Sequence, residues 1–166
     1  MVWIIFAVHF SLVVLAAVRS TWHFSLSTPL ALGGGIALIA VGGPIHLSAT
    51  YTFGFKRQSG LDTTRLVTKG IYRWSRNPLF VSWALVLVGL GLVRESAMIL
   101  LLTLVFWVSY RLCLPLEEEL LGRLYGEAYE AYRQRTHRYF GHPRKTVETP
   151  PNKGSRPPPA AADARR

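Results

Sequence analysis

Four apolar segments, each close to the length of a bilayer crossing, constrain this chain more than any other feature. They lie at residues 2–18, 29–49, 78–93 and 96–114, and a helix needs roughly 20 residues to cross the hydrocarbon core. In lipid, only a helix satisfies its backbone hydrogen bonds within a single segment. We therefore expect an all-α integral membrane protein with about four transmembrane helices. A charged fraction of only 17% agrees, because soluble domains average about a quarter.

The basic residues predict the orientation of these segments. Six Lys and Arg fall between residues 50 and 77 and eleven from Arg111 onward, which leaves only Arg19 and Arg94 near the opposite ends. Lys and Arg accumulate on the cytoplasmic side of membrane proteins. An even number of crossings with both termini cytoplasmic follows, in the inner or plasma membrane if the protein is bacterial.

The net charge of +10 fits membrane lipids better than nucleic acid. The basic residues flank apolar segments, where they meet anionic head groups, and no nucleic-acid-binding motif is present. Cys113 is the one cysteine, so a Cys-rich metal site is excluded and no metal is predicted.

Beyond the fourth apolar segment the sequence changes character twice. Residues 116–135 have helical periodicity and predict a cytoplasmic amphipathic helix. Residues 142–166 are basic and rich in proline, which predicts a disordered tail. We expect a single membrane domain over residues 1–141.

A polar cluster, GIYRWSRNPLF, precedes the third apolar segment. Asn77 suits a helix N-cap and Pro78 suits the first turn, so a helix start, which favours anions, is expected there. Arg73 and Arg76 add positive charge. The cluster is either part of a ligand site or a set of topology markers that bind lipid phosphate.

Glu117 and Glu118 form a second polar group. At 100° per residue, Glu117 falls within the apolar stripe of the predicted helix and Glu118 at its edge, whereas Glu119 points away. A carboxylate on an apolar face requires a cation. That cation is either Arg73, Arg76 or Arg111 in a structural salt bridge, or the ammonium or sulfonium group of a ligand.

Two stretches together resemble a known family. LVTKGIYRWSRNP, residues 66–78, is similar to the signature LVTxGxYxxxRHPxY, and EEELLGRLYGEAYEAYRQRTHRYF, residues 117–140, is similar to EExxLxxxFGxxYxxYxxxVxR. Both belong to the integral membrane methyltransferases related to isoprenylcysteine carboxyl methyltransferase and phospholipid methyltransferases. Asn77 and Phe80 stand where the family has histidine and tyrosine, which removes any mechanism that needs an imidazole at that position.

The resemblance implies S-adenosylmethionine as the cofactor, held between the start of the third membrane helix and the C-terminal helix. We predict Arg76, Glu117 and Glu118 as catalytic candidates. The predicted cofactor-binding residues are Gly70, Tyr72, Arg76, Asn77, Pro78, Phe80, Glu117, Glu118, Leu121, Tyr125, Tyr129 and Tyr132.

The expected function is methyl transfer at the cytoplasmic membrane surface to a lipidic or small hydrophobic acceptor, through a carboxylate, thiol or amine. Two alternatives remain open at this point. The C-terminal region of membrane sterol reductases, which use a nicotinamide cofactor, is distantly similar, and a non-enzymatic membrane scaffold would pair both glutamates internally. The sequence leaves the acceptor and the oligomeric state undetermined.

Overall fold

The computed structural model describes residues 2–19, 22–25, 28–54 and 65–144, and within these ranges the chain is all-helical. Its one β feature there is an isolated bridge between His23 and Ser96. The predicted all-α fold is confirmed for the described residues. The elements are α1 (Val2–Arg19), α2 (Thr28–Phe53), a 3-10 helix η1 (Gly70–Arg73), α4 (Pro78–Val93), α5 (Ala97–Tyr125) and α6 (Glu127–Arg135).

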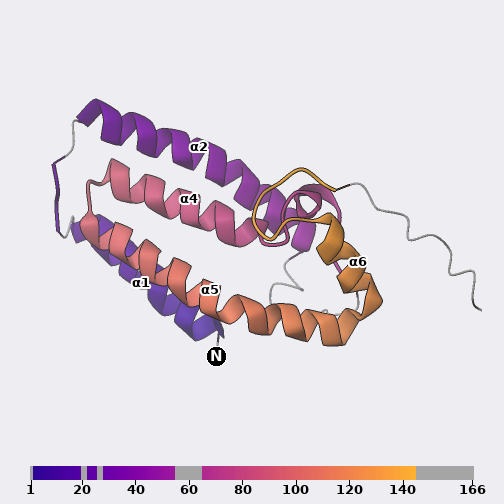
Figure 1. The fold of residues 1–166 in the computed structure, drawn as a ribbon. Helices are drawn as coiled ribbons and strands as arrows, with labels where there is room; N and C mark the ends of the chain where they lie inside the picture. Colours follow the sequence, from indigo (N-terminus) through magenta and orange to yellow (C-terminus); the bar gives the residue numbers. More distant parts are fainter. Residues whose placement is uncertain (1, 20–21, 26–27, 55–64, 145–166) are drawn as a thin grey trace, which may run out of the picture.

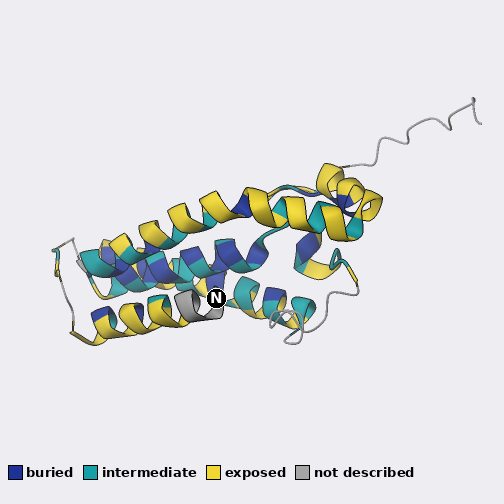
Figure 2. Ribbon diagram, turned by 90° about the horizontal axis from the view of Figure 1, so that it is seen from below, coloured by how far each residue is buried: buried dark blue, intermediate teal, exposed yellow. Residues whose placement is uncertain are grey.

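The four long helices run antiparallel to their neighbours in the sequence (Figure 1). At one end of the bundle, α2 finishes, η1 and α4 begin, and the last turns of α5 meet α6; we call this the site end. The far end holds the junctions α1–α2 and α4–α5. Helix α4 lies in the middle, where its residues are mostly buried or half-buried, whereas α1 and α5 carry many exposed residues (Figure 2).

Glycines allow α2 and α4 to approach closely, and these two helices share the most extensive helix–helix contact. A Cβ added to Gly35 would lie 2.7 Å from the carbonyl oxygen of Gly89, and one added to Gly42 would lie 2.9 Å from the carbonyl oxygen of Ser82. By contrast, Gly34 faces open space. Small residues on one face of a helix produce this kind of backbone contact in membrane proteins.

The far end is closed by hydrogen bonds between its two connections. Phe24 N–H donates to the Glu95 carbonyl at 3.0 Å, and Ala97 N–H donates to the Trp22 carbonyl at 2.9 Å. Trp22 and Glu95 both have positive φ angles, 55° and 45°, a conformation that costs energy for residues other than glycine. These bonds therefore hold α1 and α2 against the α4–α5 pair.

The helix boundaries correct the prediction in two places. Helix α2 runs from residue 28 to Phe53 rather than from 29 to 49, and it passes through Pro44. The fourth apolar segment does not stop at Leu114, because α5 continues through Pro115 to Tyr125. The predicted helix 116–135 is therefore wrong: its first half belongs to α5 and its second half is α6. Gly126, with φ +52° and ψ −128°, separates them in a conformation that favours glycine.

Two helices are long and apolar enough to span a membrane, Pro29–Phe53 and Ala97–Tyr125. The apolar stretches Ala7–Arg19 and Pro78–Val93 are shorter. The predicted loop residues 55–64 and residues 145–166 of the predicted tail lie outside the described residues. Membrane association is consistent with these helices.

Candidate functional site

The chain before α4 is fixed by contacts with α2 and α6. Gly70, at φ +59°, opens η1, and a Cβ there would lie 3.0 Å from Thr52 Oγ1 of α2. Tyr72 is buried and stacks on Phe53, and its carbonyl accepts a 2.8 Å hydrogen bond from the Tyr132 hydroxyl of α6. Burial raises the pKa of both Tyr72 and Tyr132, so both hydroxyls stay protonated near neutral pH. These contacts give Gly70 and Tyr72 a structural role at the site end.

Asn77 occupies the N-cap position of α4, but its side chain does not cap the helix. Its Nδ2 donates to the Arg138 carbonyl at 2.9 Å, and its Oδ1 accepts a 2.8 Å hydrogen bond from the Tyr110 hydroxyl of α5. The predicted capping role of the Asn77 side chain is therefore corrected. Asn77 instead joins the start of α4 to α5 and to the segment after α6, where the His137 carbonyl accepts from Arg76 N–H at 2.9 Å.

Glu118 is held by two arginines. Its Oε1 lies 3.1 Å from Arg76 Nη1, and both side chains are only 10% exposed. Arg138 donates to the same carboxylate through Nε at 3.1 Å and Nη2 at 2.7 Å. These bonds raise the pKa of Arg138. For Glu118, the alternative of a structural salt bridge is confirmed, with Arg76 as one partner.

Arg76 keeps unused hydrogen-bond donors inside this cluster. Its Nε and Nη1 are buried and make no hydrogen bond to any described residue, because the 3.1 Å approach of Nη1 to Glu118 is an ion pair without hydrogen-bond geometry. Tyr129 lies beside it and is 3% exposed. Burial and Glu118 raise the pKa of Tyr129, while the Arg76 guanidinium opposes that rise. The two arginines and one carboxylate leave one positive charge available to an anion.

Glu117 differs from Glu118, its neighbour in sequence. It is exposed, and within the described part of the chain it forms no ion pair. Its Oε2 lies 3.4 Å from the hydroxyl of Tyr110, whose shorter bond goes to Asn77. Both glutamates were expected to need a cation, but Arg76 and Arg138 both pair with Glu118, whose side chain is only 10% exposed. Glu117 remains the carboxylate free to meet a cation.

Phe80 extends the site into an aromatic cluster. It is 3% exposed and stacks on Tyr110, with ring centroids 3.8 Å apart, and on Trp107 at 4.7 Å. Trp107 stacks in turn on Tyr139, beyond α6. Tyr110 was absent from the predicted set although it contacts Asn77, Phe80 and Glu117. Its position two helical turns before Glu117 was the available signal, since residues seven apart share a helix face.

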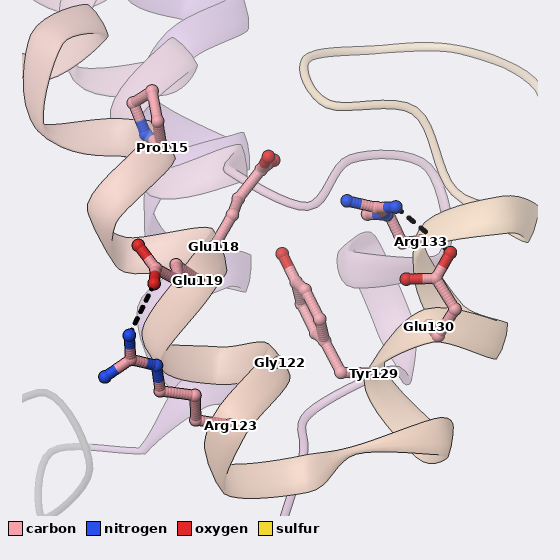
Figure 3. A pocket seen from close by; sticks show the side chains of 8 residues that line it. All are labelled: Pro115, Glu118, Glu119, Gly122, Arg123, Tyr129, Glu130 and Arg133. Atoms are coloured by element: carbon pink, nitrogen blue, oxygen red, sulfur yellow. Dashed lines mark hydrogen bonds and ion pairs between the residues drawn. The ribbon is translucent and has the colours of Figure 1, made fainter.

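A hollow of about 520 Å³ lies between α5 and α6, and we call it the α5–α6 hollow. Figure 3 shows Tyr129 between the two helices, with Glu118 above it and the ion pairs Glu119–Arg123 and Glu130–Arg133 on either side. Glu118 and Tyr129 both border the hollow and both adjoin Arg76. Its lining is Pro115, Glu118, Glu119, Gly122, Arg123, Tyr129, Glu130 and Arg133.

The structure thus brings together most of the predicted residues. Arg76, Asn77, Pro78, Phe80, Glu117 and Glu118 meet where α4 begins against α5, and Tyr129 and Tyr132 cover this junction from α6. Leu121 and Tyr125 are half-buried and lie one and two turns beyond Glu118 along α5.

The charged groups at the site suit a ligand that carries both a positive and a negative charge. An exposed carboxylate without an ion pair, Glu117, suits an ammonium or sulfonium group, and the unused donors of Arg76 suit a carboxylate. The aromatic faces nearby favour a cation or a flat ring. S-adenosylmethionine has all of these groups, so the residues present fit it.

The fold and this cluster define a helical, membrane-associated protein with a polar site at one end of its bundle. The family profile described as phospholipid methyltransferase matches residues 30–128, from α2 to the start of α6. The chain belongs to the phospholipid methyltransferase family. The match includes Arg76, Asn77, Glu117 and Glu118, and the resemblance inferred from the two motifs is confirmed.

Individual relatives share part of the chain. It is 37% identical over 83 residues to the nickel-cobalt-cadmium resistance protein NccN of Alcaligenes xylosoxydans xylosoxydans, which covers 49% of this chain and 38% of that protein. It is 28% identical over 109 residues to probable protein-S-isoprenylcysteine O-methyltransferases of Oryza sativa subsp. indica and japonica, covering 62% of this chain and 57% of theirs. The chain thus spans between about two fifths and three fifths of the length of these relatives. No solved structure matches it.

Proposed function

We propose that this protein transfers a methyl group from S-adenosylmethionine to a lipidic or small hydrophobic acceptor at the cytoplasmic membrane surface. The observation that carries this proposal is the different pairing of two adjacent carboxylates. Glu118 is neutralised by Arg76 and Arg138, whereas Glu117 has no ion pair among the described residues. An acidic group left unpaired beside an aromatic cluster is suited to a cationic ligand.

The bound cofactor would supply an electrophilic methyl group on a sulfonium. The residues of this chain contribute binding and orientation: Glu117 attracts the cationic end, and Arg76 holds a carboxylate with its unused donors. The Tyr110 hydroxyl contacts both Asn77 and Glu117 and so fixes the position of these two side chains relative to each other. Phe80, Trp107 and Tyr139 limit water on the apolar side of the site. Positioning of this kind supplies much of the catalysis when two bound reactants must meet in line.

We further propose four crossings, with the site end cytoplasmic and residues 1–141 as one domain. Helix α4 is only about 24 Å long, at 1.5 Å per residue, but it packs between longer neighbours. Among the described residues, Arg73, Arg76, Arg123, Arg133, Arg135 and Arg138 lie at the site end, against Arg19 and Arg94 at the far end. This distribution supports the predicted orientation.

Calorimetry on the full chain in detergent tests the cofactor assignment. We expect S-adenosylmethionine and S-adenosylhomocysteine to bind and NADPH not to bind. Glu117→Gln should weaken S-adenosylmethionine at least tenfold. The matched control Glu127→Gln, an exposed acid in the first turn of α6, should not change the affinity. NADPH binding would favour a reductase, and binding of none of the three would favour a scaffold.

The acceptor class is tested separately, by incubating the protein in vesicles with isotope-labelled methyl donor and candidate acceptors. Mass spectrometry of the extracted lipids and small molecules should find the label on a carboxylate, thiol or amine of a membrane-borne compound. Label confined to water-soluble compounds would contradict the lipidic acceptor.

A further inference from the structure

The outer side of α5 carries a row of exposed leucines that extends past Pro115. Leu112, Leu116, Leu120 and Leu124 are 73%, 68%, 56% and 53% exposed. Residues four apart lie next to one another along one side of a helix. The row continues the exposed apolar side of the first half of α5, which includes Val105 and Val108. Exposed apolar side chains therefore occur along most of the helix, from Leu101 to Leu124.

The described elements that pack against α5 leave this row uncovered. The buried residues Ile99, Thr103 and Leu114 are on the side of α5 that faces the bundle. The amphipathic helix predicted for residues 116–135 was expected to lie against the membrane or against the bundle, with Leu124 on its apolar stripe. In the structure Leu124 points outward, because α5 and α6 are separate helices.

The length of α5 shows where the row would lie in a membrane. Its 29 residues measure about 44 Å, against about 30 Å for the hydrocarbon core. If α5 begins at the opposite boundary and stands upright, its last nine or so residues would leave the core, placing Leu120 among the head groups and Leu124 at their outer edge. A tilt of about 40°, at the upper end of the observed range, shortens its span to about 34 Å. Leu116 and Leu120 would then remain in the core, with Leu124 at the head groups.

The polar neighbours of the row are compatible with this placement. Glu119 and Arg123, one helical turn apart and beside the leucines, form an ion pair with each other. The guanidinium of an arginine next to lipid can reach toward the polar surface while its aliphatic stem stays among apolar groups. Gly122 and Glu118, on a different side of the same turns, line the α5–α6 hollow.

We propose that residues 116–124 of α5 are immersed in the membrane, with the leucine row against lipid acyl chains and head groups. The occupant of this surface is lipid rather than a second copy of the chain, because the row is continuous with the apolar side of the membrane-spanning half of α5. With this tilt, the turns that carry the leucine row extend from the hydrocarbon core to the head groups. This inference does not depend on methyl transfer.

Site-directed spin labelling tests the proposal on the full chain. Cys113 is exposed and is the one cysteine in the sequence, so Cys113→Ala provides a cysteine-free background. Single cysteines replace Leu120 or Leu124, with Leu101→Cys as the membrane control and Glu127→Cys as the aqueous control. The labelled proteins are placed in vesicles of phosphatidylcholine and phosphatidylglycerol. Collision rates with oxygen and with a water-soluble nickel complex are then measured by power saturation.

We expect the ratio of oxygen to nickel collisions at Leu120→Cys to approach that at Leu101→Cys and to exceed that at Glu127→Cys severalfold. Leu124→Cys should lie between the controls. A ratio at Leu120→Cys equal to that at Glu127→Cys would overturn the proposal, because the row would then face water. Low collision rates with both reagents, together with dipolar broadening between labels, would overturn it in favour of a dimer contact. Unchanged thermal unfolding of each variant confirms that the exposed substitutions preserve the fold.

Discussion

The two adjacent glutamates give the most discriminating prediction, because the structure assigns them different roles. Glu118→Gln removes the charge that neutralises Arg76, whose side chain is only 10% exposed. Removing one partner of a buried ion pair costs about 3–5 kcal/mol, since the other charge is left uncompensated. Arg138 is 44% exposed, so its share is below about 1 kcal/mol. Glutamine still offers one acceptor, which places the expected loss near 3 kcal/mol, at the lower end.

Thermal unfolding in detergent measures this loss as a decrease in Tm. For a chain of this size, about 3 kcal/mol corresponds to roughly 6–12 °C. The control is Glu117→Gln, which keeps an acceptor for the Tyr110 hydroxyl and loses no ion pair. Its Tm should stay within about 2 °C of the wild type, because substitutions without buried partners change stability by about 0.5 kcal/mol or less.

Cofactor affinity should respond mainly to the other substitution: Glu117→Gln weakens it while leaving the fold intact. The reasoning is refuted if Glu118→Gln unfolds at the wild-type temperature, or if Glu117→Gln is the destabilised variant. Either result would mean that the Arg76–Glu118–Arg138 contacts do not hold the site end together.

Two further substitutions test the scaffold around the site. Gly35→Ala should lower Tm by several degrees, because its Cβ would lie 2.7 Å from a backbone oxygen of α4, whereas Gly34→Ala, which faces open space, should leave Tm unchanged. Tyr132→Phe removes the hydrogen bond to the Tyr72 carbonyl and should cost about 1 kcal/mol in chemical unfolding. Because burial raises the pKa of Tyr132, its contribution is present below the unfolded pKa of about 10 and is lost as pH rises above it. Tyr132→Phe should therefore show a shallower alkaline loss of stability than the wild type; an equal slope would contradict this.

Several features could be predicted from sequence because they depend on local patterns. The apolar segments and the Asn-Pro start of α4 mark helices through length, composition and turn chemistry. The two motifs also predicted that Arg76 and Glu118 would lie close together, although 42 positions separate them. Helix boundaries near proline were less predictable. Pro115 removes one backbone donor but does not end α5, since the surrounding turns retain their bonds.

The sequence could not predict which glutamate pairs with arginine or which groups the Asn77 side chain binds. On an idealised helix, Glu117 falls within the apolar stripe and Glu118 at its edge, but the basic partners Arg76 and Arg138 both lie beside Glu118. Asn77 was expected to cap its own helix, yet Tyr110 and the Arg138 carbonyl both bind its side chain. Such contacts depend on how separate helices pack against one another, which the periodicity of a single segment does not show.

The sequence by itself determined that the chain forms apolar helices, where most of them begin, and which charged residues had to find partners. Burial of apolar surface and backbone hydrogen bonding act over a few residues, so their effects are visible in the order of amino acids. The tertiary structure alone decided which carboxylate is neutralised by arginine and which stays available. That choice depends on the relative rotation of α4, α5 and α6, because an ion pair forms only between groups that packing brings within a few ångströms.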